Sequence, residues 1–171
     1  GYVYSRMTNP TVSVFEERIA QLEGGRGAVA TSSGHAAQFI AAATLMEAGD
    51  EFIASRNLYG GSVTQFGVSF PKLGWKCNFV DPTDPENFEK AMNDKVKFIF
   101  CEGVANPGGI ILDLEKIADI AHKHGVLLIV DNTLASPYLL RPFEWGADLV
   151  VHSTTKFIGG HGNTMGGILI E

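Results

Sequence analysis

The feature that most constrains the fold is an alternation of short apolar segments with longer segments whose apolar residues recur at helical spacing. The short segments are typical of strands, and they cover residues 27–31, 51–55, 75–80, 97–101, 126–130, 148–151 and 167–170. The longer segments predict helices at 10–22, 35–48, 59–70, 85–92 and 113–124. Strands that alternate with helices are joined by crossovers. The sequence therefore predicts an α/β fold with a seven-stranded, mostly parallel sheet flanked by helices.

The last two predicted strands depart from this alternation. No amphipathic helix fits between Val151 and Gly167. Neighbouring parallel strands need a long crossover, which is usually helical. We therefore expect the seventh strand to run antiparallel to its neighbours.

Charge and composition argue against several classes of partner. The 171 residues carry a formal net charge of −6 and no run of Lys and Arg, so we expect no nucleic-acid partner. No apolar run approaches the roughly 18 residues of a membrane span, so we expect no membrane partner. Cys77 and Cys101 lie in predicted strands without CxxC spacing, and we interpret them as core thiols of a cytoplasmic protein. The five histidines lack HExxH spacing, so we assign no metal.

A lysine follows the sixth predicted strand at once. Ser153 and Thr155 bring hydroxyls to the end of that strand, Lys156 comes next, and a glycine-rich turn at 159–162 follows. Ligands of open α/β sheets bind outside the carboxyl ends of the strands. Lys156 is therefore interpreted as an amine for Schiff-base chemistry beside a bound anion. A solvated surface lysine on a polar turn is the alternative.

Other strand ends carry groups that suit the same ligand. Ser33 and Gly34 open a helix after the first strand, where free N–H groups favour a phosphate, although plain N-capping is the alternative. Asp131 ends the fifth strand and needs a cationic or proton-donating partner there, unless it is a loop ion pair or a cap. A phosphate site, an amine and a carboxylate at one edge match the needs of pyridoxal phosphate. No P-loop and no G-x-G-x-x-G competes with this interpretation.

Four stretches carry a resemblance to a known family. They are Tyr4–Thr11 (YSRMTNPT), Leu58–Gly61 (LYGG), Val130–Tyr138 (VDNTLASPY) and His152–Gly162 (HSTTKFIGGHG). With them, the whole chain resembles the Cys/Met-metabolism family of fold-type-I pyridoxal-phosphate enzymes. KFIGGHG together with Arg141–Glu144 (RPFE) is more similar to the sulfhydrylases of that family than to its γ-lyases.

The resemblance implies roles for individual residues. Lys156 would form the Schiff base and move protons, and Asp131 would pair with the ring nitrogen. Tyr59 would stack on the ring and assist proton transfer. The remaining implied cofactor contacts are Ser33, Gly34, His35, Ser153 and Thr155 at the phosphate, Asn106 and Thr133 near the ring, and Tyr4 and Arg6 at the phosphate of a neighbouring subunit. His35 stands where the γ-lyases commonly have methionine, and its imidazole is expected to tune phosphate affinity.

The resemblance also implies an activity and a domain organisation. Residues 1–10 would be an arm reaching a neighbouring subunit of a homodimer or homotetramer. Residues 11–171 would be the cofactor-binding large domain of a longer enzyme, whose C-terminal domain is absent here. The implied reaction replaces the acetoxy group on the γ-carbon of O-acetylhomoserine by sulfide or a thiol, giving homocysteine or methionine and acetate. A γ-lyase or a cystathionine γ-synthase of the same family is the nearer alternative, and a non-catalytic scaffold domain is the more distant one.

Overall fold

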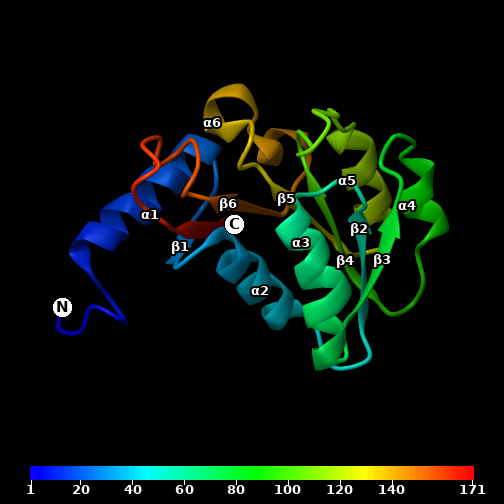
Figure 1. The fold of residues 1–171 in the computed structure, drawn as a ribbon, viewed down its shortest axis with the longest axis horizontal. Helices are drawn as coiled ribbons and strands as arrows, with labels where there is room; N and C mark the ends of the chain where they lie inside the picture. The colour runs from blue at the N-terminus through cyan, green and yellow to red at the C-terminus, as the bar shows by residue number, and fades with distance from the viewer.

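Seven strands form one sheet in the computed structural model, which describes residues 1–171 (Figure 1). Their bounds are β1 (Ala28–Thr31), β2 (Glu51–Ser55), β3 (Lys76–Val80), β4 (Val96–Glu102), β5 (Leu127–Asp131), β6 (Leu149–Ser153) and β7 (Gly167–Ile170). All seven strands coincide with predicted ones to within one or two residues. The prediction of the strand content is therefore confirmed.

The sheet is mixed, with a single strand of reversed direction. Its order is β1-β7-β6-β5-β4-β2-β3. Strands β2 to β6 pair in parallel, whereas β7 is antiparallel to both β1 and β6, as the missing crossover helix predicted. Because β7 is antiparallel to both of its neighbours, β1 runs in the same direction as β6. The carboxyl ends of β1, β4, β5 and β6 therefore share one edge of the sheet.

Helix α1 precedes β1, and the other helices lie between successive strands in the chain. They are α1 (Pro10–Glu23), α2 (Gly34–Leu45), α3 (Gly60–Thr64), α4 (Glu86–Lys90), α5 (Leu114–Lys123) and α6 (Ser136–Leu139). The start of α1 follows from its sequence, because the Asn9 side chain accepts hydrogen bonds from the N–H groups of Thr11 and Val12 and Pro10 takes the first helical position. Gly24 ends this helix in the left-handed conformation, with φ of 82°.

Three helical predictions needed correction. Helix α2 stops at Leu45 and not at residue 48, because Met46 is extended and the Asp50 carboxylate binds the N–H of Glu47 at 2.8 Å. Helix α3 continues through a π-helical turn (Gln65–Ser69) and a 3-10 turn (Phe70–Leu73), beyond the predicted end. Between β5 and β6, where no helix was predicted, lie α6 and a 3-10 turn (Pro142–Trp145).

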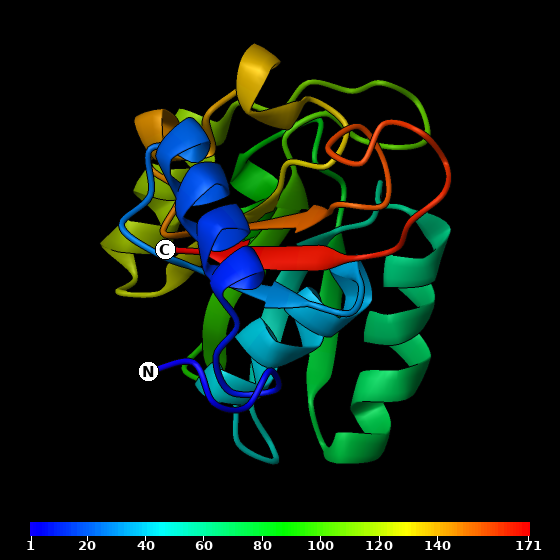
Figure 2. The same ribbon diagram turned by 90° about the vertical axis from the view of Figure 1, so that its left-hand side faces the viewer.

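The helices cover both faces of the sheet, and side chains of each strand alternate between them. In Figure 2, α3 and α5 lie on opposite sides of the strands. On the face covered by α1 and α5, Val130 and Val150 are fully buried. On the face covered by α2 and α3, Ile129 and Val151 are buried. The alternation follows from the two-residue period of a strand, and it decides which side of the sheet each strand-end residue faces.

The N-terminal segment before α1 extends away from the sheet (Figure 1). Its side chains are mostly exposed, and they include Tyr4 and Arg6. None of the helices has both the length and the apolar character needed to cross a membrane.

Candidate functional site

A cavity of ≈ 720 Å³ opens at the edge of the sheet where the parallel strands end. Glu102 ends β4, Asp131 ends β5, and these two residues are register partners. Ten of the twelve predicted site residues line the cavity: Ser33, Gly34, His35, Tyr59, Asn106, Asp131, Thr133, Ser153, Thr155 and Lys156. The structure thus brings together groups that are up to about 120 positions apart in the chain, because crossovers return each strand to the same edge.

The polar residues at the strand ends obey the same alternation as the core. Asp131 follows Ile129 by two positions, and Ser153 follows Val151 by two, so both belong to the face covered by α2 and α3. Glu102 follows Phe100 in the same way. These three polar side chains consequently lie on one face, where the cavity is.

Lys156 lies in the turn after β6, with an exposed side chain that lines the cavity and forms no ion pair. The turn is held by its backbone, since the N–H of Lys156 binds the carbonyl of Ser153 and the N–H of Gly160 binds the carbonyl of Lys156 at 2.7 Å. Gly160 has φ of 74°, a conformation that favours glycine. The amine is therefore free to react with a molecule in the cavity.

Asp131 is buried and is held by Gln38 from α2 and by Thr133, two residues further along the chain. The amide of Gln38, in α2, donates to Oδ2 at 3.1 Å. The Thr133 hydroxyl donates to Oδ1 at 2.5 Å, and the Thr133 N–H donates to the same oxygen at 2.9 Å. Gln38 also donates to the hydroxyl of Ser62. These contacts fix the direction of the carboxylate without neutralising it, so it can still pair with a cationic group in the cavity.

The N-terminus of α2 lies against the end of β6. Ser33 caps the helix, accepting the N–H of Ala36 at 3.1 Å. A Cβ at Gly34 would lie 2.8 Å from the Cβ of Ser153, so only glycine permits this approach. Because α2 has twelve residues, its first-turn N–H groups and its dipole favour an anion between the helix and Ser153.

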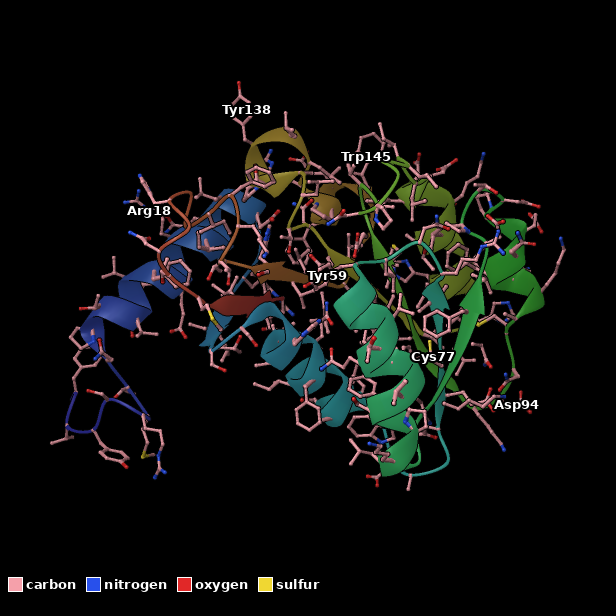
Figure 3. The ribbon with its side chains drawn as sticks, viewed as in Figure 1. Arg18, Tyr59, Cys77, Asp94, Tyr138 and Trp145 are labelled. Atoms are coloured by element: carbon pink, nitrogen blue, oxygen red, sulfur yellow. The ribbon has the colours of Figure 1, made fainter.

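Tyr59 and His35 form an aromatic pair at the cavity wall. Their ring centroids are 5.8 Å apart and their planes are inclined by 30°. Tyr59 stands at the start of α3, beside the strand ends, as Figure 3 shows. Its ring is half exposed and offers a flat face to a planar ligand.

Glu102 is a buried acid at the same site, and the sequence placed it at the end of its strand without giving it a role. Its Oε1 accepts the N–H of Tyr59 at 2.7 Å, and its Oε2 accepts the N–H of Asn106 at 2.8 Å. Burial, reinforced by the nearby Asp131 carboxylate, raises the pKa of Glu102 to about 7, although the two N–H groups oppose the shift.

Sequence reasoning also missed Gln38 and Ser62. Both are polar side chains that are almost fully buried, and both line the cavity. Gln38 is a polar residue within an alanine-rich apolar helix, and this contrast in polarity was the signal in the sequence that could have indicated it.

Three predicted site residues have other contacts in this chain. The Thr155 hydroxyl donates to the carbonyl of Gly166 at 3.2 Å and accepts the N–H of Gly166 at 3.1 Å. Its hydroxyl must turn before it can donate to a phosphate. Tyr4 and Arg6 do not line the cavity, and the Arg6 guanidinium lies 5.0 Å from the centre of the Tyr4 ring. The individual roles of all twelve residues stay predictions.

Comparison with known proteins assigns the family. The family model described as Cys/Met metabolism PLP-dependent enzyme matches residues 1–171. The chain belongs to this family. It is 54% identical to the sulfhydrylase FUB7 of Gibberella moniliformis and 50% identical to the O-acetyl-L-homoserine sulfhydrylase of Leptospira meyeri. Both alignments cover all of this chain and about 40% of the relative, at 40% and 39%.

Solved structures share the fold of this family member closely. One is a crystal structure described as an O-acetylhomoserine (thiol)-lyase from Campylobacter jejuni, which contains pyridoxyl-lysine monophosphate. Its TM-score is 0.97 at 41% identity, covering 100% of this chain and 42% of that one. Another is metB from Corynebacterium glutamicum, with a TM-score of 0.96 at 38% identity, covering 99% of this chain and 44% of that one.

The residues of the cavity fit pyridoxal phosphate, the cofactor of the family. The helix N-terminus beside Ser153 is suited to the phosphate, and Gly34 leaves the space that this approach requires. Lys156 supplies an unpaired amine, and Asp131 supplies an oriented carboxylate for the ring nitrogen. No group of three or more His, Cys, Asp or Glu side chains is arranged to hold a metal ion.

Proposed function

We propose that the whole protein is an O-acetylhomoserine sulfhydrylase and that this chain forms its cofactor-binding domain. The observation that carries the proposal is the convergence of Lys156, Asp131 and the N-terminus of α2 on one cavity. The relatives that carry this activity in their names support the choice of reaction. Because the chain spans about 40% of their length, the activity is a proposal for the whole protein.

The chain's own residues bind and orient the cofactor. First-turn N–H groups of α2, together with Ser153, bind the phosphate. Asp131, held by Gln38 and Thr133, keeps a proton on the ring nitrogen. When bound, pyridoxal phosphate supplies an electron sink for the electron pair that remains when a proton leaves a substrate carbon.

Lys156 moves the protons. Its amine is free of ion pairs and sits on a flexible stem at the cavity, so it can take a proton from the α-carbon of the substrate and then one from the β-carbon. The bond from the γ-carbon to the acetate oxygen breaks, and acetate leaves with its electron pair. The sulfur of sulfide or of a thiol then bonds to the γ-carbon, and the protons are returned. The product is homocysteine or, from methanethiol, methionine, so the reaction belongs to methionine biosynthesis.

The assembly that this function implies has its site shared between subunits. Residues 1–10 form an arm, and the exposed Tyr4 and Arg6 on it contact the phosphate in a neighbouring subunit of a homodimer or homotetramer. Residues 11–171 form the cofactor-binding domain. The unpaired thiols of Cys77 and Cys101 support a reducing, cytoplasmic compartment.

The direct test is an absorbance titration of the full-length enzyme with pyridoxal phosphate, followed by product analysis. We expect a band near the visible edge that Lys156→Ala loses. Lys97→Ala is the matched control, because Lys97 is a partly exposed lysine of β4 that pairs with Asp50 away from the cavity. With O-acetylhomoserine and sulfide, the enzyme should form homocysteine. Release of a keto acid and ammonia without use of sulfide would assign a γ-lyase, and an unaltered band in Lys156→Ala would contradict the proposed site.

A further inference from the structure

The buried Glu102 joins two loops that the rest of the chain holds separately. Tyr59 precedes α3, while Asn106 follows β4, and 47 positions separate them in the sequence. Each loop forms its own local backbone hydrogen bonds. The carbonyl of Tyr59 accepts the N–H groups of Ser62 and Val63. In the other loop the N–H of Ala105 donates to the carbonyl of Ile110, and the carbonyl of Ala105 accepts the N–H of Gly109. The carboxylate of Glu102 binds both loops at once, with one oxygen for each.

Each of the two loops contributes one residue to the lining of the cavity. Tyr59 and Asn106 line the cavity together with Glu102 itself. Glu102 is only 5% exposed, so its contacts with the two N–H groups are not weakened by exchange with water. A carboxylate suits this task because each of its oxygens accepts, whereas an amide offers one acceptor and one donor group.

A charged carboxylate is unfavourable at the position of Glu102 unless it binds both N–H groups. A second carboxylate, that of Asp131, lies beside it at the end of β5, and their repulsion and the burial both disfavour ionisation of Glu102. The other titratable groups around the cavity are His35 from α2, Tyr59 before α3 and Lys156 after β6. A neutral apolar residue would avoid the repulsion, but it would leave the N–H groups of Tyr59 and Asn106 without the acceptor that Glu102 provides.

We propose that Glu102 is a positioning residue, which sets the places of Tyr59 and Asn106 around the cofactor by holding the N–H group of each with a separate carboxylate oxygen. The proposal rests on the proposed function for the identity of the ligand. It does not make Glu102 a catalytic residue, because Glu102 acts through the two residues that it holds.

The test compares full-length enzymes by their dissociation constant for pyridoxal phosphate, their absorbance spectrum and the melting temperature of the cofactor-free form. Glu102→Gln keeps the shape but can accept only one of the N–H groups, and Glu102→Asp is too short to reach both. Each variant should raise the dissociation constant by about tenfold or more and shift the spectrum. Glu51→Gln is the matched control, because Glu51 is also buried and accepts from Asn78 and Asn93, at the opposite end of the strands. It should bind cofactor like the wild type.

A pH profile separates positioning from general destabilisation. The pKa of Glu102 lies at about 7 because of burial. Below this pH one oxygen carries a proton and no longer accepts, so the wild type should lose cofactor affinity relative to Glu102→Gln as the pH falls from about 8 to 6. The other charged groups around the cavity are present in both enzymes, so the ratio of the two affinities reports the change at Glu102.

The results of these experiments decide whether Glu102 is a positioning residue. Wild-type affinity and spectrum in Glu102→Gln, or in Glu102→Asp, would overturn the proposal, and so would parallel pH profiles. If Glu102→Gln does not fold, Glu102→Asp and its own pH profile decide in the same way. Failure of the proposed function is recognised separately, because the wild-type enzyme would then show no band that depends on Lys156.

Discussion

Two buried polar clusters lie back to back at the end of the sheet, and they differ in what covers them. The cavity-side cluster consists of Glu102, Asp131 and Gln38 on the face covered by α2 and α3. The core-side cluster consists of Glu23, Asn132 and His152 on the face covered by α1 and α5. Asn132 is the neighbour of Asp131 in the chain, as His152 is of Ser153. Side chains of consecutive residues at the strand ends thus point to opposite faces of the sheet.

The core-side cluster is closed to solvent. Oε1 of Glu23 accepts from the Asn132 amide at 2.9 Å and also binds the imidazole of His152. All three side chains are at most 1% exposed, and Glu23 Oε2, Asn132 Oδ1 and His152 Nδ1 have no partner within the chain. In contrast, Glu102, Asp131 and Gln38 line a cavity of ≈ 720 Å³. Similar residue types are therefore enclosed in the core on one face and line a cavity on the other.

The sharpest test of the cavity side is the loss of its amine. We predict that Lys156→Ala lowers the turnover of the full-length enzyme by about 10²- to 10⁴-fold, because the group that moves the protons is gone. Steady-state assays of homocysteine formation check this, with Lys97→Ala as the control. Melting of the cofactor-free enzyme should be unchanged. A turnover within about twofold of the wild type would contradict the assignment of Lys156.

The core side should respond in stability and not in ligand binding. We predict that Glu23→Ala costs roughly 3–5 kcal/mol in free energy of unfolding, because Asn132 and His152 lose their buried partner. Denaturant titration of the cofactor-free, full-length enzyme measures it. Glu17→Ala, at an exposed position of the same helix, should stay within about 0.5 kcal/mol. A stable Glu23→Ala enzyme that has lost cofactor affinity would reverse the comparison.

Removing the charge of Asp131 tests how the cavity side uses it. Asp131→Asn keeps the size of the side chain but not its charge, and we predict a cofactor dissociation constant about tenfold to a hundredfold higher. The pKa of Glu102 should fall as well, because the repulsion by Asp131 is removed. Fluorescence titration with pyridoxal phosphate checks the first effect. The control is Asp119→Asn on the exposed side of α5, which should not change binding.

The smallest effect concerns the pH dependence of stability. In the unfolded chain Glu102 has its ordinary pKa of 4.5, and burial raises it to about 7 in the folded state. For an acid with a raised pKa the folded state holds the proton more tightly. Its contribution to stability is complete below the unfolded pKa and is lost as the pH rises through the folded one.

The cofactor-free wild type should therefore lose on the order of 1–3 kcal/mol between about pH 5 and 8 relative to Glu102→Gln. Melting curves at several pH values measure the difference in stability between the two enzymes. Carboxylates with a lowered pKa, such as Asp81 and Glu89, contribute equally to both, so their contributions cancel. Equal slopes for the two enzymes would mean that Glu102 ionises as easily as an exposed acid.

Much of the fold could be predicted because its signals are local. Short segments with apolar residues marked all seven strands, and the missing crossover helix before β7 revealed its reversed direction. The glycine turn and the polar strand ends marked Lys156, Asp131 and Ser153 as neighbours, because parallel strands end at one edge. The cofactor followed from these groups and from the resemblance of four stretches to a known family.

Other features had no local signal. The short helix α6 lacks an amphipathic repeat, and the π-helical turn at Gln65–Ser69 has no pattern that marks it in a single sequence. Gln38, Glu102 and Glu23 are ordinary polar residues in the sequence. Their partners are 93, 43 and 109 positions away, so only the folded chain shows what they bind.

The sequence by itself determined the order of the strands, the sheet edge at which the cavity lies and the lysine that lines it, because strand alternation and turn chemistry act over a few residues. The tertiary structure alone decided which buried acids face the cavity and which are closed into the core. That choice depends on the helices that pack over each face, and the packing joins residues that are distant in the chain.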